Sequence, residues 1–171
     1  MYVTLPDKDH DGHFKWVDKT EITFSNYDSH CDTGYLLYGD FCYYFETKMV
    51  KNWQDAEAHC TREQGHLASF HTEEELSFLI GDKGTTKWIG LRSNPIEGGY
   101  SWSDGTPLSH TNWGDGEPNN HEGREDCVEM VSNANGTYSL WNDLNCDAHQ
   151  DWISRAVLQI AKFYRLWFAM F

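Results

Sequence analysis

Apolar residues along the chain recur first at helical and then at strand-like spacing. Two groups repeat every three or four positions, the interval that places side chains on one buried helix face: Trp53, Ala56 and Cys60, then Leu76, Leu79 and Ile80. The short apolar run at 87–91 follows them and is typical of a buried strand. The pattern predicts two helices ahead of this strand, with strands and loops over the rest of the chain.

Polar residues mark the ends of both predicted helices. Asn52 stands in an N-cap position with Asp55 in the first turn, and Gly65 follows as the expected terminator. The segment 72–75, Thr-Glu-Glu-Glu, is a capping box ahead of the second helix, and Gly81 comes after that helix. Each helix is therefore bounded by a cap and a glycine.

Two pairs of cysteines bracket segments that a disulfide would close. Cys31 and Cys42 enclose a predicted hairpin with a Gly-Asp turn, and Cys127 and Cys146 stand at the exit of a long segment, 93–141, rich in turn-forming residues. A loop of that length is normally either disordered or held for a purpose. Because buried indoles such as those of Trp102 and Trp113 can anchor it from inside, we expect an ordered loop. From the positions of the cysteines we expect the disulfides Cys31–Cys42 and Cys127–Cys146.

The chain is strongly acidic, with 13 Lys plus Arg against 27 Asp plus Glu and a formal charge of −14. This charge argues against nucleic acid and anionic membrane surfaces as partners, and it suits a cation site. Five Cys and eight Trp are typical of a secreted or ectodomain module, and Asn135 begins a glycosylation sequon in a predicted loop. No secretory signal follows Met1, so we interpret the chain as an internal fragment or an unusual gene product.

The chain contains a partial copy of itself. Residues 2–27 align without a gap on residues 88–113, with identities at Leu5/Leu91, Gly12/Gly98, Trp16/Trp102, Asp18/Asp104, Thr20/Thr106 and Asn26/Asn112. The upstream copy lacks the predicted helices and any cysteine, so it is not expected to fold alone. We predict a remnant with a linker at 1–30, one complete domain at 31–161, and an aromatic tail at 162–171 that is too short to span a bilayer.

Short oxygen-bearing side chains gather in the second half of the long loop and at the strand that follows it. Calcium takes roughly six to eight oxygen ligands of this kind. The candidate metal ligands are Glu117, Asn119, Glu125, Asn142 and Asp143. A cis Glu117–Pro118 peptide would let the side chains on both sides of the proline face one ion, and we predict that isomer here.

Taken in order, the cysteines, the two helices and the loop motifs resemble the long form of the C-type lectin-like domain. The motifs that carry the resemblance are Trp88–Leu91, Glu117–Asn119, Glu125–Cys127, Trp141–Asp143, Cys146 and Trp152–Ile153. The resemblance covers residues 31 to about 160 and implies an α+β fold, with two helices packed on small antiparallel sheets and a long calcium-binding loop. The partial upstream copy is similar to the tandem domains of the macrophage mannose receptor family.

The triplet at 117–119, Glu-Pro-Asn, resembles that of family members that bind mannose, N-acetylglucosamine or fucose. The resemblance implies that vicinal sugar hydroxyls coordinate the calcium directly, so the five metal ligands are also the carbohydrate-binding residues. Their carboxylates would accept hydroxyl hydrogens and their amides would donate them. The implied partners are mannose-type glycans or glycoproteins, bound by an extracellular or cell-surface receptor or a secreted lectin. Association with a membrane is expected only through other parts of a receptor, outside this chain.

The sequence departs from the family at one disulfide. In the family, Cys60 would pair with a cysteine just after Ile153, but Ser154 stands there, so Cys60 is predicted to be a free thiol. The missing bridge would have contributed on the order of 4 to 5 kcal/mol by loop closure.

Two other functions stay open. The domain could bind a protein, with calcium serving only as scaffold. A carboxylate enzyme with Glu117 and Glu125 as acid and base is the weaker alternative, because oxygen ligands that converge on one ion leave no carboxylate free and no nucleophile motif is present. We therefore predict a binding protein and not an enzyme.

Overall fold

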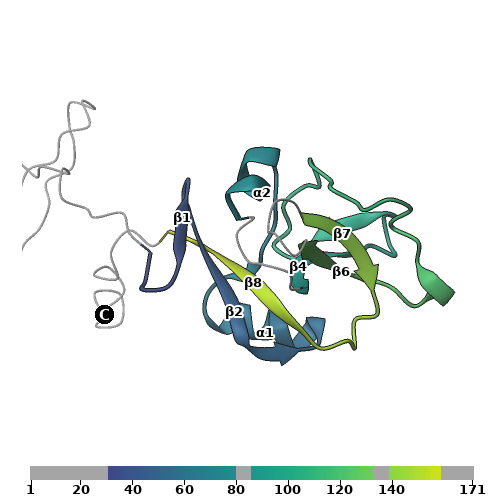
Figure 1. Ribbon diagram of the computed structural model, residues 1–171, viewed down its shortest axis with the longest axis horizontal. Coiled ribbons are helices and arrows are strands. Elements are labelled where there is room, and N and C mark those ends of the chain that lie inside the picture. The colour runs from purple at the N-terminus through teal and green to yellow at the C-terminus, as the bar shows by residue number, and fades with distance from the viewer. Residues whose placement is uncertain (1–30, 80–85, 133–138, 159–171) are drawn as a thin grey trace, which may run out of the picture. The chain divides into compact units, whose positions relative to one another are not determined.

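The computed structural model describes residues 31–79, 86–132 and 139–158. Within them two α-helices accompany a β-sheet (Figure 1). The elements are β1 (Leu36–Tyr38), β2 (Phe41–Lys51), α1 (Trp53–Arg62), β3 (His66–Leu67), α2 (Glu73–Leu79), β4 (Thr86–Ser93), β5 (Tyr100–Trp102), the 3-10 turn η2 (His121–Gly123), β6 (Cys127–Ser132), β7 (Ser139–Leu144) and β8 (Gln150–Val157). The predicted remnant at 1–30, the tail at 162–171 and the sequon residue Asn135 lie outside the described residues.

The strands form one sheet in the order β1-β2-β8-β4-β6-β7, with β3 on β8 and β5 on β4. The last strand, β8, lies between β2 and β4, so it joins the first hairpin to the strands that carry the long loop (Figure 1). The β4–β8 pair is parallel and the other pairs are antiparallel. The expected α+β fold is confirmed. In place of the expected small antiparallel sheets, the parallel β4–β8 pair joins the antiparallel strands into one mixed sheet.

Helix α1 begins where its cap predicts. The Asn52 side chain accepts a hydrogen bond from the Asp55 N–H at 2.8 Å, which satisfies one of the free donors of the first turn. The helix buries the predicted face of Trp53, Ala56 and Cys60. The Trp53 indole N–H donates to the Ile89 carbonyl at 2.8 Å, so the helix is joined directly to β4.

Gly65 has a different role from the one expected of a helix terminator. Gln64 takes the left-handed conformation at the end of α1, with φ of 67°. A side chain at Gly65 would meet the Arg155 carbonyl oxygen at 2.5 Å. The glycine is therefore required for the close approach of this turn to β8, and the sequence pattern could not reveal that approach.

Helix α2 starts at the predicted capping box. The Thr72 hydroxyl accepts the Glu75 N–H at 3.1 Å. The Glu75 carboxylate accepts the His71 N–H at 2.8 Å and the Tyr43 hydroxyl, so the helix start is tied to β2. Leu76 and Leu79 are buried as expected, whereas Ile80 lies outside the described residues.

Tryptophans of the long loop pack inside the domain as predicted. Trp102 and Trp141 are buried and meet edge to face, with ring centroids 5.6 Å apart. Trp113 packs on the same Trp141 ring at 5.9 Å. Because aromatic pairs of this geometry add to the free energy of burial, the loop is held from its inner side.

The expected cysteine pairing is confirmed. Disulfides join Cys31 to Cys42 and Cys127 to Cys146. Cys60 is the free cysteine of the described residues, and it is buried in α1. The second disulfide joins the start of β6 to the segment after β7, so it crosslinks these two strands next to the long loop.

A buried guanidinium connects β8 with the long loop. Arg155 lies 3.5 Å above the Phe41 ring, and its Nη1 is 3.1 Å from the Asp104 carboxylate. Burial alone would raise the pKa of Asp104, but hydrogen bonds from Ser69 and Thr106, together with the Arg155 charge, hold it below its ordinary value of 3.8. The ion pair therefore stabilises the fold wherever Asp104 is ionised.

We expect Asp104→Ala to lower the free energy of unfolding at pH 7 by about 3 kcal/mol, because Arg155 loses a charged partner in a buried place. A lowered folded pKa contributes stability above the unfolded value of 3.8 and loses it as the pH falls through the folded value. Urea unfolding at pH 7 and pH 3 should show the deficit shrinking in acid. The exposed loop residue Asp115 gives the control Asp115→Ala, and an equal loss in both variants would contradict the prediction.

Candidate functional site

The second half of the long loop is tied along β7 by backbone hydrogen bonds. The Gly114 N–H donates to the Trp141 carbonyl at 2.9 Å, and the Trp141 N–H donates to the Asn112 carbonyl at 2.8 Å. This pairing places the segment 117–120 beside Asn142 and Asp143. Residues separated by more than twenty positions in the chain therefore share one edge of the sheet.

The Glu117–Pro118 peptide is cis, as predicted. The side chains on both sides of the proline contact each other, since Asn119 Nδ2 donates to Glu117 Oε1 at 2.8 Å. The Asn119 N–H also donates to Glu117 Oε2, at 3.1 Å. A carboxylate and an amide are thus presented together at the surface of the loop.

Asp143 holds this part of the loop from below. Its side chain is fully buried, with 0% exposure. Its carboxylate accepts the Asn119 N–H at 3.0 Å, the Asn120 N–H at 2.8 Å and the Tyr100 hydroxyl at 3.1 Å. These three donors, from two segments, therefore hold the Asp143 carboxylate next to the backbone that carries Glu117 and Asn119.

Glu117 and Asp143 place two carboxylates next to each other. Partial burial and the neighbouring Asp143 carboxylate raise the pKa of Glu117. A divalent cation between such groups would relieve their repulsion and supply the charge they lack. Together with the Asn119 carbonyl oxygen, they are hard oxygen donors of the type that calcium prefers, so this part of the site fits the ion.

The other two predicted ligands have different partners in the structure. Glu125 accepts the His121 N–H at 2.8 Å, and its own N–H donates to Asn120 Oδ1 at 3.1 Å. Asn142 Nδ2 donates to the Glu129 carboxylate at 2.9 Å. Across residues 31–79, 86–132 and 139–158, no three acidic, histidine or cysteine side chains gather as a metal-binding group. The structure brings Glu117, Asn119 and Asp143 into one hydrogen-bonded group, and the side chains of Glu125 and Asn142 bond other residues.

Three side chains that contact the predicted ligands were not foreseen from the sequence. They are Tyr100, which donates to Asp143, Asn120, which accepts from Glu125, and Glu129, which accepts from Asn142. Alternation along β6 and β7 could have indicated Glu129, because it stands directly opposite Asn142. No local pattern indicates Tyr100, which reaches Asp143 across 43 positions of the chain.

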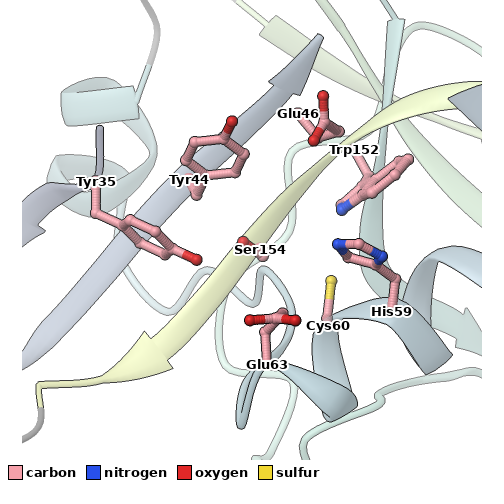
Figure 2. A pocket seen from close by; sticks show the side chains of 8 residues that line it. All are labelled: Tyr35, Tyr44, Glu46, His59, Cys60, Glu63, Trp152 and Ser154. Atoms are coloured by element: carbon pink, nitrogen blue, oxygen red, sulfur yellow. The ribbon is translucent and has the colours of Figure 1, made fainter. Parts of the chain in front are cut away.

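A cavity lies between residues of α1 and β8, around the free thiol. Figure 2 shows Cys60 of α1 and Ser154 of β8 among the side chains that line it. The cavity has a volume of about 230 Å³, and its remaining lining residues are Tyr35, Tyr44, Glu46, His59, Glu63 and Trp152. Burial raises the pKa of Cys60 to about 12, so at neutral pH the group is an unreactive thiol.

Comparison with known proteins decides the family. A family model described as the Lectin C-type domain matches residues 49–155. The chain belongs to the C-type lectin domain family. This C-type lectin domain is 38% identical over 125 residues to the mouse low affinity immunoglobulin epsilon Fc receptor. The match covers 72% of the chain and 36% of the receptor, so the chain spans little more than a third of that relative.

Solved structures support the same assignment. The cow C-type carbohydrate-recognition domain of CD23, solved in the presence of a GlcNAc2Man3 oligosaccharide, superposes with a TM-score of 0.67 and 34% identity, over 76% of this chain and 98% of that chain. A calcium-independent type II antifreeze protein superposes equally well, with a TM-score of 0.67 and 32% identity, over 76% of this chain and 96% of that chain. The fold is thus that of C-type lectin domains, and one neighbour of this fold is calcium-independent.

The family assignment sets the enzyme alternative aside. C-type lectin domains are non-enzymatic binding domains, so Glu117 and Glu125 are not an acid and base pair. The expected likeness to the macrophage mannose receptor family stays a prediction, because the relatives described above are other proteins.

Proposed function

We propose that this domain binds carbohydrate through a calcium ion held by the loop and by β7. The ion would be held by Glu117, Asn119, Glu125, Asn142 and Asp143. The observation that carries the proposal is the contact of Glu117 with Asn119 above the buried carboxylate of Asp143. When bound, calcium supplies open coordination positions that two neighbouring sugar hydroxyls can occupy.

The pairing of acid and amide gives the proposed site its selectivity. A carboxylate can only accept a hydrogen bond, whereas an amide NH2 donates one. Glu117 therefore selects a hydroxyl that donates its hydrogen toward the carboxylate, and Asn119 selects a hydroxyl whose lone pair accepts the amide hydrogen. The resemblance of Glu117-Pro118-Asn119 to the triplet of family members that bind mannose, N-acetylglucosamine or fucose is the basis for proposing this sugar class.

The proposal is tested with the full chain on mannose-agarose. Retention at millimolar calcium, followed by release on adding EDTA, is the expected result, since a site of this class has a dissociation constant of roughly 10⁻⁴ to 10⁻³ M. Free mannose should release the protein as well. A chain that stays folded by circular dichroism but is not retained on mannose, N-acetylglucosamine or fucose resins would refute the proposal.

A protein-binding role is the second candidate. It is favoured by Glu125 and Asn142, whose side chains have partners other than Glu117, Asn119 and Asp143. In that case the loop would keep its structure through hydrogen bonds to Asp143, and calcium would be dispensable. Binding of a protein ligand that survives EDTA and deglycosylation of that ligand would favour this role.

We further propose an extracellular or cell-surface location, as part of a receptor or a secreted lectin. Two disulfides support an oxidising compartment. None of the helices in the described parts of the chain is long and apolar enough to cross a membrane. The domain boundaries at 1–30, 31–161 and 162–171, the glycosylation of Asn135 and the membership of a tandem array belong to the same proposal.

A further inference from the structure

The site residue Asn142 lies over a buried carboxylate that the proposed function does not use. Glu129 of β6 stands directly opposite Asn142 of β7 in the antiparallel register, so their side chains share one face of the sheet. Glu129 is only 6% exposed, whereas Asn142 is half-buried. An ionisable group is costly to place there unless it is fully hydrogen-bonded.

Both oxygens of the Glu129 carboxylate have amide partners. Asn142 Nδ2 donates to Oε1 at 2.9 Å, and Gln150 Nε2 donates to Oε2 at 2.6 Å. The Thr86 hydroxyl donates in turn to Gln150 Oε1 at 2.6 Å. Hydrogen bonds thus link β4, β8, β6 and β7, and the donors from β8 and β7 converge on the Glu129 carboxylate. Each member is satisfied, so the carboxylate is held in one place.

This arrangement fixes which end of the Asn142 amide faces outward. An ionised carboxylate has no hydrogen to donate, so only the nitrogen of the amide can face Glu129. The carbonyl oxygen of Asn142 is then directed away from Glu129, and one N–H remains for another partner. The carbonyl oxygen can then bind calcium, and the remaining N–H can donate to a sugar hydroxyl. The proposed function requires both contacts from Asn142.

We propose that Glu129 is a positioning residue for the calcium and sugar site. Its carboxylate, held by Gln150, keeps the Asn142 amide in the orientation that offers the carbonyl oxygen to the ion. The inference rests on the proposed function, because it assigns a role within the same site. Glu129 itself touches neither ion nor sugar.

The test compares two substitutions of Glu129 by calcium titration of the full chain. Glu129→Leu removes the acceptor and should weaken calcium binding about 10- to 100-fold, as is usual for residues that orient a metal ligand. Glu129→Gln should stay near wild type, because its amide oxygen still accepts from Asn142 while Gln150 turns its own oxygen toward the new NH2 group. Glu46→Leu is the control, since Glu46 is also 6% exposed and accepts the Lys48 N–H within its own strand, β2. Equal losses in Glu129→Leu and Glu129→Gln would overturn the inference.

A second pair of variants keeps the test decisive if Glu129→Leu does not fold. Asn142→Asp adds a charged oxygen ligand, which by itself should strengthen calcium binding. With Glu129 in place, the new carboxylate would face another carboxylate, so we expect weaker binding. The double variant Glu129→Gln with Asn142→Asp should recover it, because the amide introduced at position 129 can then donate to the acid. Stronger binding by Asn142→Asp alone would contradict the proposal.

A readout without calcium separates this inference from the proposed function. In EDTA, one side-chain amide proton of Asn142 should exchange slowly with solvent in the wild type, because it is bonded to Glu129, and its exchange should become fast in Glu129→Leu. A wild-type protein that shows this slow exchange but takes up no calcium would refute the proposed function alone. A wild-type protein that binds calcium while its Asn142 amide exchanges freely would refute the role of Glu129 alone.

Discussion

The free energy of unfolding of the oxidised Ser154→Cys variant is expected to exceed that of the wild type by about 4 to 5 kcal/mol. The new disulfide would join β8 to Cys60 of α1, and it would close a loop that contains most of the domain. Loop closure of that length removes a large part of the entropy of the unfolded chain. The gain is comparable with the whole stability of many small domains, so the melting temperature should rise on the order of 10 °C or more.

The structure places the substituted residue beside the cavity that holds the free thiol. Ser154 pairs with Leu67 and Tyr44 in the sheet, and its side chain lines the same cavity as the Cys60 thiol (Figure 2). Serine and cysteine differ by one atom, so the substitution keeps the packing around Trp152. Thermal unfolding is measured with and without a reductant. The gain should vanish on reduction.

Two control variants isolate the disulfide. Ser154→Ala removes the hydroxyl without adding a thiol, and Ser154→Cys combined with Cys60→Ala adds a thiol without a partner. Both should melt within a few degrees of the wild type. If the double variant is stabilised as much as Ser154→Cys, the effect comes from packing in the cavity and the entropy argument is wrong.

Exchange of acid and amide in the loop is expected to reverse the preference between sugars. Glu117→Gln with Asn119→Asp keeps the net charge, the oxygen donors and the size of both side chains. It exchanges the accepting and the donating side of the pair that the structure brings together at 2.8 Å. We expect galactose to be retained in place of mannose, with a change of at least about tenfold in relative affinity, or about 1.4 kcal/mol.

A matched control exists in the first half of the same loop. Asn94 Nδ2 lies 3.3 Å from the Glu97 carboxylate, so Glu97→Gln with Asn94→Asp makes the same chemical exchange away from the site. That variant should keep the mannose preference. Competition by mannose and galactose for each immobilised variant gives the ratio directly. An unchanged ratio in the Glu117 and Asn119 variant would show that other residues contact the sugar hydroxyls.

Local signals in the chain predicted the elements well, because their causes are local. Asn52 and Thr72 cap helices through backbone groups three residues away. The hairpin disulfide Cys31–Cys42 and the cis Glu117–Pro118 peptide likewise involve neighbours in sequence. Local signals do not reveal the role of Gly65, because its constraint comes from Arg155 on a distant strand.

The candidate site was predicted in part for the same reason. Its residue types and their order were visible in the chain, including the pair Glu117 and Asn119 that the structure brings into contact. Their supports were not visible, since Tyr100 and Glu129 reach Asp143 and Asn142 across strands that pair only in the folded sheet. The hydrogen bonds of Glu125 to His121 and Asn120 were not visible either, because the chain between them makes a left-handed turn at Asn120 and Glu122.

The sequence by itself determined the helices and the disulfides, which follow from spacing, capping and residue type and need no knowledge of the sheet. The free thiol follows from the resemblance to the family, whose partner cysteine is replaced by Ser154. Only the tertiary structure decided which oxygens meet. The insertion of β8 between β2 and β4, and the pairing of β6 with β7, bring Asp143 under the loop and Glu129 under Asn142. Buried polar groups must find partners across strands, and the order of strands is a property of the whole fold.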